Sequence, residues 1–182
     1  TTLQGRPVPG TLEAEDYDAG GYSDSTSGNQ GGAYRQDDVD IEPVSGGGYS
    51  ICYVRSGEWL RYTVPVATTG QYRAAFRASA WGTASHAIEV VVDGHVAANV
   101  PIPNTGGYSS WTTATVDLPL SSGNRVLTLR FVGDGQNLDR VVFTPLSVTN
   151  AQTTVPTTAP TTAPTTVPTT VKPTTTVPTT VV

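Results

Sequence analysis

The chain has 182 residues, of which 15 are acidic and 10 are Lys or Arg, and its formal net charge at pH 7 is −5. All the acidic residues lie within residues 1–150, where nine arginines and no lysine leave a net charge of −6. Because phosphate recognition depends on Lys and Arg, this balance argues against nucleic-acid binding. No stretch is long and apolar enough to span a bilayer, so no membrane insertion is expected.

The composition divides the chain into a part that can bury a core and a tail that cannot. Residues 151–182 contain 15 Thr and 6 Pro, no aromatic residue and a single charge, Lys172. We therefore predict an N-terminal linker over residues 1–8, one folded domain over residues 9–147 and a disordered, extended Thr/Pro-rich linker over residues 148–182. Such tails are typical of stalks between extracellular modules, so we expect a piece of a longer secreted or surface protein.

Period-2 alternation of apolar and polar side chains predicts strands over residues 58–66, 71–80, 86–93 and 126–132. The pair Asp93-Gly94 predicts a tight hairpin turn. No segment has a helical apolar stripe. The pattern predicts an all-β domain, a β-sandwich of two antiparallel sheets that each bury one face. Function is expected in the loops, which are residues 20–33, 45–50, 104–110 and 133–137.

Acidic residues gather early in the folded part. Nine of the fifteen acids fall between Glu13 and Glu42, where Arg35 is the only basic residue. In an extended strand Glu13 and Glu15 would point to the same face, about 6.5–7 Å apart. A carboxylate pair of this kind needs a partner if it is buried, and a cation would supply one. A solvated acidic face is the alternative interpretation.

Cysteine and histidine carry little of the predicted function. Cys52 is the only cysteine, so no intrachain disulfide can form, and its apolar surroundings in sequence favour a buried thiol. His86 and His95 each stand singly at the end of a predicted strand and are expected to be surface polar residues.

Five short stretches follow one another along the folded part of the chain: GTLEAEDYD, GGAYRQDDVDIE, YVRSGEWLRYTVPV, VPIPNTGGYSSWTTATVDLPL and GDGQNLDRVVF. Their order and spacing resemble family 6 carbohydrate-binding modules and their family 35 relatives. The resemblance spans residues 9–144 and implies a jelly-roll β-sandwich with a structural calcium ion and no catalytic activity. Carried over by position, the calcium ligands would be the carboxylates of Glu13, Glu15 and Asp139 and the backbone carbonyl of Arg35. Calcium prefers such oxygen ligands.

The resemblance also implies a cleft at the loop end, where two aromatic rings sandwich a sugar and an asparagine binds its hydroxyl groups. The matching residues are Tyr34 in GGAYR, Tyr108 in NTGGYSSW and Asn137 in GQNLD. A tyrosine offers a flat apolar body with a polar tip, and an asparagine offers both donors and an acceptor. The family usually has Trp where Tyr108 stands, so the stacking surface is expected to be smaller.

The tryptophans are expected to have secondary roles. Trp111 is expected to pack at the start of a strand, and Trp81 to lie on an exposed turn from which it would extend a site. Trp59 and Arg61 would reach a second cleft, on the concave sheet face that some family members use, only if that face is open.

We therefore predict a monomeric, extracellular, non-catalytic module that binds polysaccharide such as xylan, cellulose or β-glucan and targets a covalently linked catalytic or anchoring module. One alternative is a cell-surface adhesion module that presents the same site on a stalk. The other is a polysaccharide-degrading enzyme, which would need two carboxylates across a cleft. Loop residues such as Asp24, Ser25 and Asn29 are expected to decide which sugar is bound.

Overall fold

Eleven β-strands and one turn of 3-10 helix make up the regular structure of residues 6–147, the part of the chain that the computed structural model describes. The predicted all-β fold is confirmed, and within these residues no helix has the length and apolar character needed to cross a membrane. The predicted linker over residues 148–182 lies outside the described residues. In chain order the elements are β1 (Gly10–Glu13), η1 (Ala14–Asp16), β2 (Tyr22–Ser23), β3 (Ile41–Pro43), β4 (Tyr49–Ile51), β5 (Trp59–Val66), β6 (Gly70–Ala80), β7 (His86–Val92), β8 (His95–Ile102), β9 (Thr112–Leu120), β10 (Gly123–Val132) and β11 (Gln136–Pro145).

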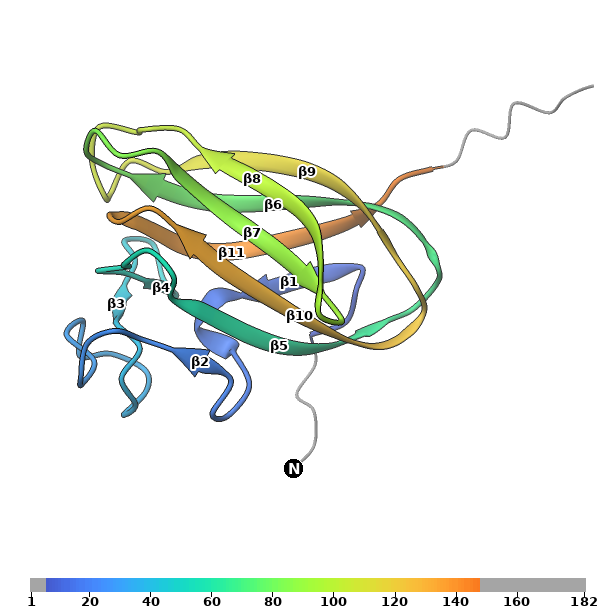
Figure 1. Cartoon of the computed structure of the whole chain (residues 1–182), viewed down its shortest axis with the longest axis horizontal. Coiled ribbons are helices and arrows are strands. Elements are labelled where there is room, and N and C mark those ends of the chain that lie inside the picture. Colours follow the sequence, from blue (N-terminus) through green and yellow to red (C-terminus); the bar gives the residue numbers. More distant parts are fainter. Residues whose placement is uncertain (1–5, 148–182) are drawn as a thin grey trace, which may run out of the picture. The chain divides into compact units, whose positions relative to one another are not determined.

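The strands form two antiparallel sheets stacked in two layers, which confirms the predicted β-sandwich (Figure 1). One sheet has the order β3-β4-β11-β6-β9, with β1 also paired to β11, and the other has the order β2-β5-β10-β7-β8. Val8 forms an isolated bridge to Val66 and is buried. The folded module therefore already includes Val8, one residue inside the predicted N-terminal linker.

Strands β5 and β6 show how the sequence builds the core. In β5 the side chains of Leu60, Tyr62 and Val64 are buried, and in β6 those of Tyr72 and Phe76 are buried, as the alternation predicts. Burying a large apolar side chain contributes about 1.5–3 kcal/mol to folding. Alternating positions of both sheets thus supply one shared core between the layers.

The predicted hairpin turn joins β7 to β8. Asp93 and Gly94 have φ angles of 50° and 84°, the left-handed values that a type I′ turn requires at both central positions. The Asp93 carboxylate also accepts a hydrogen bond from the Val126 amide (2.9 Å) and pairs with Arg125 (3.0 Å). The turn is therefore fixed to the neighbouring strand β10.

Four connections meet at the end of the sandwich opposite this hairpin: residues 52–58, 81–85, 103–111 and 133–135 (Figure 1). Backbone hydrogen bonds join three of them, from the Trp81 amide to the Gly135 carbonyl (3.1 Å) and from the Gly135 amide to the Val54 carbonyl (3.0 Å). The Thr105 amide donates to Ala80 at the end of β6 (2.8 Å). Of the four loops that were expected to carry function, residues 104–110 and 133–137 thus lie at this end of the sandwich and are tied to it by backbone hydrogen bonds.

The expected common face of Glu13 and Glu15 is wrong. Strand β1 ends at Glu13, and η1 begins at the next residue. The Arg35 side chain donates to the backbone carbonyls of Glu15 (2.9 Å) and Tyr17 (2.6 Å), contacts that hold the chain in the turn. The Glu15 side chain is consequently buried, at 5% exposure, while Glu13 is half-buried.

The expectation for His86 is also wrong, whereas those for His95 and Cys52 are confirmed. His86 opens β7 in the same phase as Ile88 and Val90, so it points into the protein and is buried. Among residues 6–147 its Nε2 atom finds no hydrogen-bond partner. His95 is exposed, and Cys52 is a buried free thiol.

Candidate functional site

A cavity of about 110 Å³ opens among the clustered loops, and we refer to it as the loop-end cavity. It brings together two of the three predicted sugar-binding residues, Tyr108 and Asn137. The third, Tyr34, is not among its lining residues, and a different tyrosine, Tyr53, takes that place. The full lining is Glu42, Cys52, Tyr53, Tyr108, Gly135 and Asn137.

Tyr53 and Tyr108 are the exposed aromatic surfaces of the cavity. Tyr53 follows β4 and has a φ angle of 51°, and 55% of it is exposed. Tyr108 lies in the β8–β9 connection and is 42% exposed. The Ser79 hydroxyl donates to the Tyr108 carbonyl (2.7 Å), which ties this loop to β6. Large aromatic rings left open to solvent in a concave site are typical of ligand-binding surfaces.

Asn137 supplies the polar group of the cavity. It is the second residue of β11, its backbone pairs with Ser79 of β6, and it is 3% exposed. Its Nδ2 atom donates to Oε1 of Glu42 (3.0 Å), across 95 positions of sequence. The bond fixes the amide. Its carbonyl oxygen accepts no hydrogen bond within the described residues and is not sealed from solvent, so it is available to a ligand.

Gly135 is the spacer that keeps the cavity open. Its φ angle is 77°, a left-handed value that glycine adopts without steric cost. A Cβ atom at this position would lie 3.1 Å from both the Tyr108 hydroxyl and the Trp81 carbonyl. A side chain here would therefore displace the tyrosine ring or the adjoining loop.

A second cavity of about 210 Å³ lies on the other side of Tyr108. It shares Glu42 and Tyr108 with the loop-end cavity and adds Trp111 and Ser109 to the surface. The Arg77 guanidinium lies 4.5 Å from the centre of the Trp111 ring, which agrees with the packing role expected for Trp111. The same residue also lines the second cavity, so part of it is open to a ligand. The two cavities adjoin at Glu42 and Tyr108, and we refer to the pair as the groove.

Trp81 borders the groove as an exposed aromatic residue, as expected. It is 57% exposed, and its ring meets the Tyr108 ring edge to face, with the centroids 5.8 Å apart. Aromatic pairs in this arrangement contribute about 0.5–1.5 kcal/mol beyond area burial. Trp81 therefore orients the Tyr108 ring from outside the cavity.

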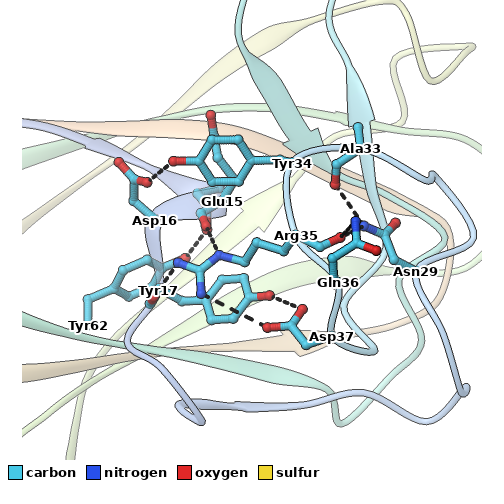
Figure 2. Close-up of polar contacts among 11 residues, drawn as sticks. Glu15, Asp16, Tyr17, Asn29, Ala33, Tyr34, Arg35, Gln36, Asp37 and Tyr62 are labelled. Atoms are coloured by element: carbon cyan, nitrogen blue, oxygen red, sulfur yellow. Dashed lines mark hydrogen bonds and ion pairs between the residues drawn. The ribbon is translucent and has the colours of Figure 1, made fainter.

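The structure places Tyr34 elsewhere, beside η1 and β4 (Figure 2). Its hydroxyl donates to the Asp16 carboxylate (2.5 Å), and its ring packs on Tyr49 with the centroids 4.8 Å apart. It remains 52% exposed and has a φ angle of 65°. Tyr34 therefore does not line the loop-end cavity, because its hydroxyl is held at Asp16, whereas Tyr53 does line it. That Tyr34 contacts a sugar stays a prediction.

The position of Tyr53 in the sequence also marks it as a candidate ligand-binding residue. Tyr53 lies within the stretch YVRSGEWLRYTVPV, directly before the strand pattern begins at Glu58 and in a segment that also holds Gly57. A tyrosine outside the alternating pattern has no core side to face, so it is a candidate for an exposed ligand contact. Tyr34 met the same criterion, and only the fold separates the two.

The predicted calcium ligands are partly brought together. Glu13, Glu15 and Asp139 are close enough for their charges to interact, since each of the other two raises the pKa of Glu15 and Asp139 raises that of Glu13. The carbonyl of Arg35 instead accepts hydrogen bonds from the side-chain amides of Asn29 (3.1 Å) and Gln36 (3.3 Å), and only its guanidinium points toward Glu15 (Figure 2). We refer to Glu13, Glu15 and Asp139 as the acidic group.

The negative charge of Glu15 is not balanced by a partner within the described residues. Burial, followed by the repulsion of the other carboxylates, raises the pKa of Glu15 to about 7, and its Oε2 atom is buried without a partner. Asp139, in contrast, accepts hydrogen bonds from Arg77 (2.7 Å) and Arg140 (2.8 Å). No three His, Cys, Asp or Glu side chains gather closely enough among residues 6–147 to form a ready metal site. The orphaned oxygen and the mutual repulsion fit a cation, whereas the Arg35 carbonyl does not fit as a ligand.

Two further sets of predicted residues lie away from the groove. Trp59 and Arg61 line a shallow hollow of about 280 Å³ on the face of the β2-β5-β10-β7-β8 sheet, so that face is open. Asp24 accepts a hydrogen bond from the Thr26 amide (2.8 Å), and Asn29 accepts one from the Ile41 amide in β3 (2.9 Å). Ser25 donates to Glu58, the residue before β5 (2.6 Å). None of these three lines either cavity of the groove.

Comparison with known proteins identifies the family. Residues 13–145 match the family model described as carbohydrate binding module (family 6). Beta-agarase AgaA from Microbulbifer thermotolerans is 30% identical over 105 residues, which are 54% of this chain and 24% of that protein. Endo-1,4-beta-xylanase B from Cellvibrio japonicus is 28% identical over 87 residues, 47% of this chain and 14% of that protein. The chain thus spans about a quarter or less of these enzymes.

Solved structures agree. The C-terminal family 6 module of LamC, a marine laminarinase from Zobellia galactanivorans, has a TM-score of 0.61 and 25% identity, and the match covers 74% of this chain and 97% of that one. A β-1,3-glucan-binding family 6 module from Bacillus halodurans has a TM-score of 0.59 and 25% identity, with 75% and 96% covered. The family match extends from the end of β1 through β11, nearly the whole described sandwich. The chain belongs to the family 6 carbohydrate-binding modules.

Proposed function

We propose that this module binds plant or algal polysaccharide of the xylan, cellulose or β-glucan type in the loop-end cavity, with the rings of Tyr53 and Tyr108 stacking on a sugar. The observation that carries the proposal is the meeting of these two exposed tyrosines with Asn137 at one concave site. The relatives named above act on or bind agarose, xylan, laminarin or β-1,3-glucan by their names, which agrees with this substrate class.

The chemistry of the site suits a sugar ring. A pyranose presents C–H groups on its faces, which pack on aromatic rings, and hydroxyl groups at its edge. The amide of Asn137 offers a hydroxyl both a donor and an acceptor, and its bond to Glu42 holds it in one orientation. A rigid site of this kind loses little conformational entropy on binding.

The role of the module is to target a linked protein to polysaccharide. Belonging to a family of non-catalytic binding modules supports a binding domain rather than an enzyme. The related enzymes are several times longer than the matched segment, which supports a covalently linked catalytic partner and an extracellular location. Tethering raises the effective concentration of the partner at its substrate. We expect the module to act as a monomer.

A structural calcium ion at the acidic group forms the second part of the proposal. Glu13, Glu15 and Asp139 would hold the ion, and its charge would neutralise the repulsion that raises the pKa of Glu15 to about 7. The buried Oε2 atom of Glu15 would gain a partner. Because Glu13 ends β1 and Asp139 lies in β11, the ion would join the first strand to the last.

Binding to insoluble and soluble polysaccharides, measured by affinity electrophoresis and calorimetry, tests the sugar-binding proposal. Tyr53→Ala and Tyr108→Ala should each weaken binding by about 10- to 100-fold, since losing a stacked ring costs about 1–3 kcal/mol. Tyr34→Ala is the matched control, because it removes an equally exposed tyrosine outside the cavity. Equal losses in all three variants, or a loss in Tyr34→Ala alone, would contradict the proposed site.

A further inference from the structure

The groove carries a single formal charge, and that charge is negative. Of the residues that line the two cavities beside Tyr108, all within residues 6–147, Glu42 is the only Asp, Glu, His, Lys or Arg. Glu42 lines both cavities, so a ligand on either side of Tyr108 meets its carboxylate. The charge therefore lies at the middle of the groove.

One oxygen of this carboxylate is available to a ligand. Oε1 accepts the bond from Asn137 (3.0 Å), whereas no group in the described part of the chain donates to Oε2. Glu42 is half-buried, and neither of its oxygens is sealed from solvent without a partner. Oε2 can accept a hydrogen bond from a sugar hydroxyl, and a bond to an ionised acceptor is about twice as strong as one between neutral groups.

Other carboxylates near Cys52 add to the negative electrostatic potential that Glu42 creates in the cavity. Burial raises the pKa of the Cys52 thiol, and the carboxylates of Glu42, Asp40 and Asp24 raise it further. Two arginines next to lining residues form ion pairs of their own. Arg77, beside Trp111, pairs with Asp139 (2.7 Å), and Arg55, two residues from Tyr53, pairs with Asp134 (3.6 Å). No described arginine lines either cavity to offset Glu42.

We propose, resting on the carbohydrate-binding function proposed above, that Glu42 makes the groove selective for uncharged glycans. A neutral sugar donates a hydroxyl proton to Oε2, whereas a uronate or sulfate ester brings a second negative charge and no donor in its place. Two like charges about 5–6 Å apart in a partly desolvated site repel strongly enough to weaken binding on the order of tenfold or more. Screening shortens the reach of this repulsion, so added salt should reduce the discrimination.

The test compares matched neutral and charged oligosaccharides on the full chain by calorimetry. The neutral probes are cellohexaose, laminarihexaose and xylohexaose. Their charged counterparts are cellohexaose and laminarihexaose oxidised at C6 to carboxylates, and xylohexaose bearing a glucuronate branch. We expect the wild-type chain to bind at least one neutral probe about tenfold or more tighter than its counterpart.

Three variants assign the effect to Glu42. Glu42→Gln keeps the acceptor for Asn137 but removes the charge, so the neutral-to-charged affinity ratio should fall to about three or less. Glu42→Asp keeps the charge and should keep the ratio while weakening binding overall. Asp117→Asn removes a charge that is paired with Arg73 on exposed β9, and it should change neither quantity.

The outcomes separate this inference from the proposed function. Tighter binding of the charged probes, or an unchanged ratio in Glu42→Gln, would overturn the selectivity and leave carbohydrate binding standing. Binding to none of the six probes would overturn the proposed function and the selectivity with it. A melting temperature of Glu42→Gln close to that of the wild-type chain confirms that the change in ratio is not a consequence of unfolding.

Discussion

The loop-end cavity and the acidic group are both built on β11, but they meet opposite conditions. In the cavity the buried amide of Asn137 is hydrogen-bonded to Glu42, and the aromatic rings are open to solvent. In the acidic group a buried oxygen of Glu15 has no partner and neighbouring carboxylates repel it. In the first region the polar groups already have partners, whereas under our proposal the second would gain stability from a bound cation.

This difference separates two kinds of effect. Truncating the exposed rings of Tyr53 and Tyr108 should alter affinity for sugar with little effect on stability, because these rings already lie open to solvent. Changes at the acidic group should alter stability with little effect on the open rings. The predictions below test that separation, from the largest expected effect to the smallest.

Removal of calcium should have the largest effect. A native-state ligand present at 100 times its Kd stabilises by about 2.7 kcal/mol, so chelation should lower the melting temperature by about 5–10 °C. Differential scanning calorimetry with EDTA and with added calcium measures the shift. Glu15→Gln should abolish it, whereas Glu89→Gln on the other sheet should leave it intact. Identical melting with and without chelator would show that the acidic group holds no cation.

Asn137→Ala should have the next largest effect, on binding. The change removes the amide that meets the sugar hydroxyl and also releases Glu42, and hydrogen bonds to charged groups are worth about 1.5–3 kcal/mol. Calorimetric affinity for the best polysaccharide should fall about 10- to 100-fold. Asn99→Ala, on the exposed face of β8, is the control. Unaltered affinity in Asn137→Ala would place the bound sugar outside the cavity.

Gly135→Ala should moderately lower both the affinity for sugar and the melting temperature. Alanine is strained at a φ angle of 77°, by about 1 kcal/mol, and its Cβ would press on the Tyr108 hydroxyl and the Trp81 carbonyl. We expect binding about fivefold weaker and a melting temperature lower by about 2–4 °C. Gly20→Ala has the same kind of strain, at 67°, with open space around the added carbon. Gly20→Ala should lower the melting temperature but leave the affinity for sugar unchanged. A loss of affinity in Gly20→Ala would refute the steric explanation.

Trp81→Ala should have the smallest effect. Its edge-to-face contact orients Tyr108 from outside the cavity, so its loss should weaken binding by about two- to tenfold. Trp59→Ala, in the hollow on the other sheet, should leave the loop-end affinity unchanged. A larger loss from Trp59→Ala than from Trp81→Ala in the same titration would move the principal binding surface to that sheet face.

Much of the fold followed from local pattern. The alternation along β5 and β6 predicted both the strands and their buried faces, because side chains of an extended chain point to opposite sides in turn. Asp93-Gly94 predicted its turn because few other residue pairs tolerate two left-handed φ angles. Tyr108 and Asn137 were found through motifs that the family shares, and the structure brings them to one cavity.

What the sequence by itself determined is therefore the sandwich, its core and the type of residue that meets a sugar, since these depend on short-range periodicity and motif. Only the tertiary structure decided that Tyr53, and not Tyr34, lines the loop-end cavity together with Tyr108, because both tyrosines are exposed loop residues with left-handed backbone. It also decided that β1 ends before Glu15, because the stabilising contact comes from Arg35, 20 residues away. Contacts between residues far apart in the chain leave no local pattern, so they appear only once the sheets are packed.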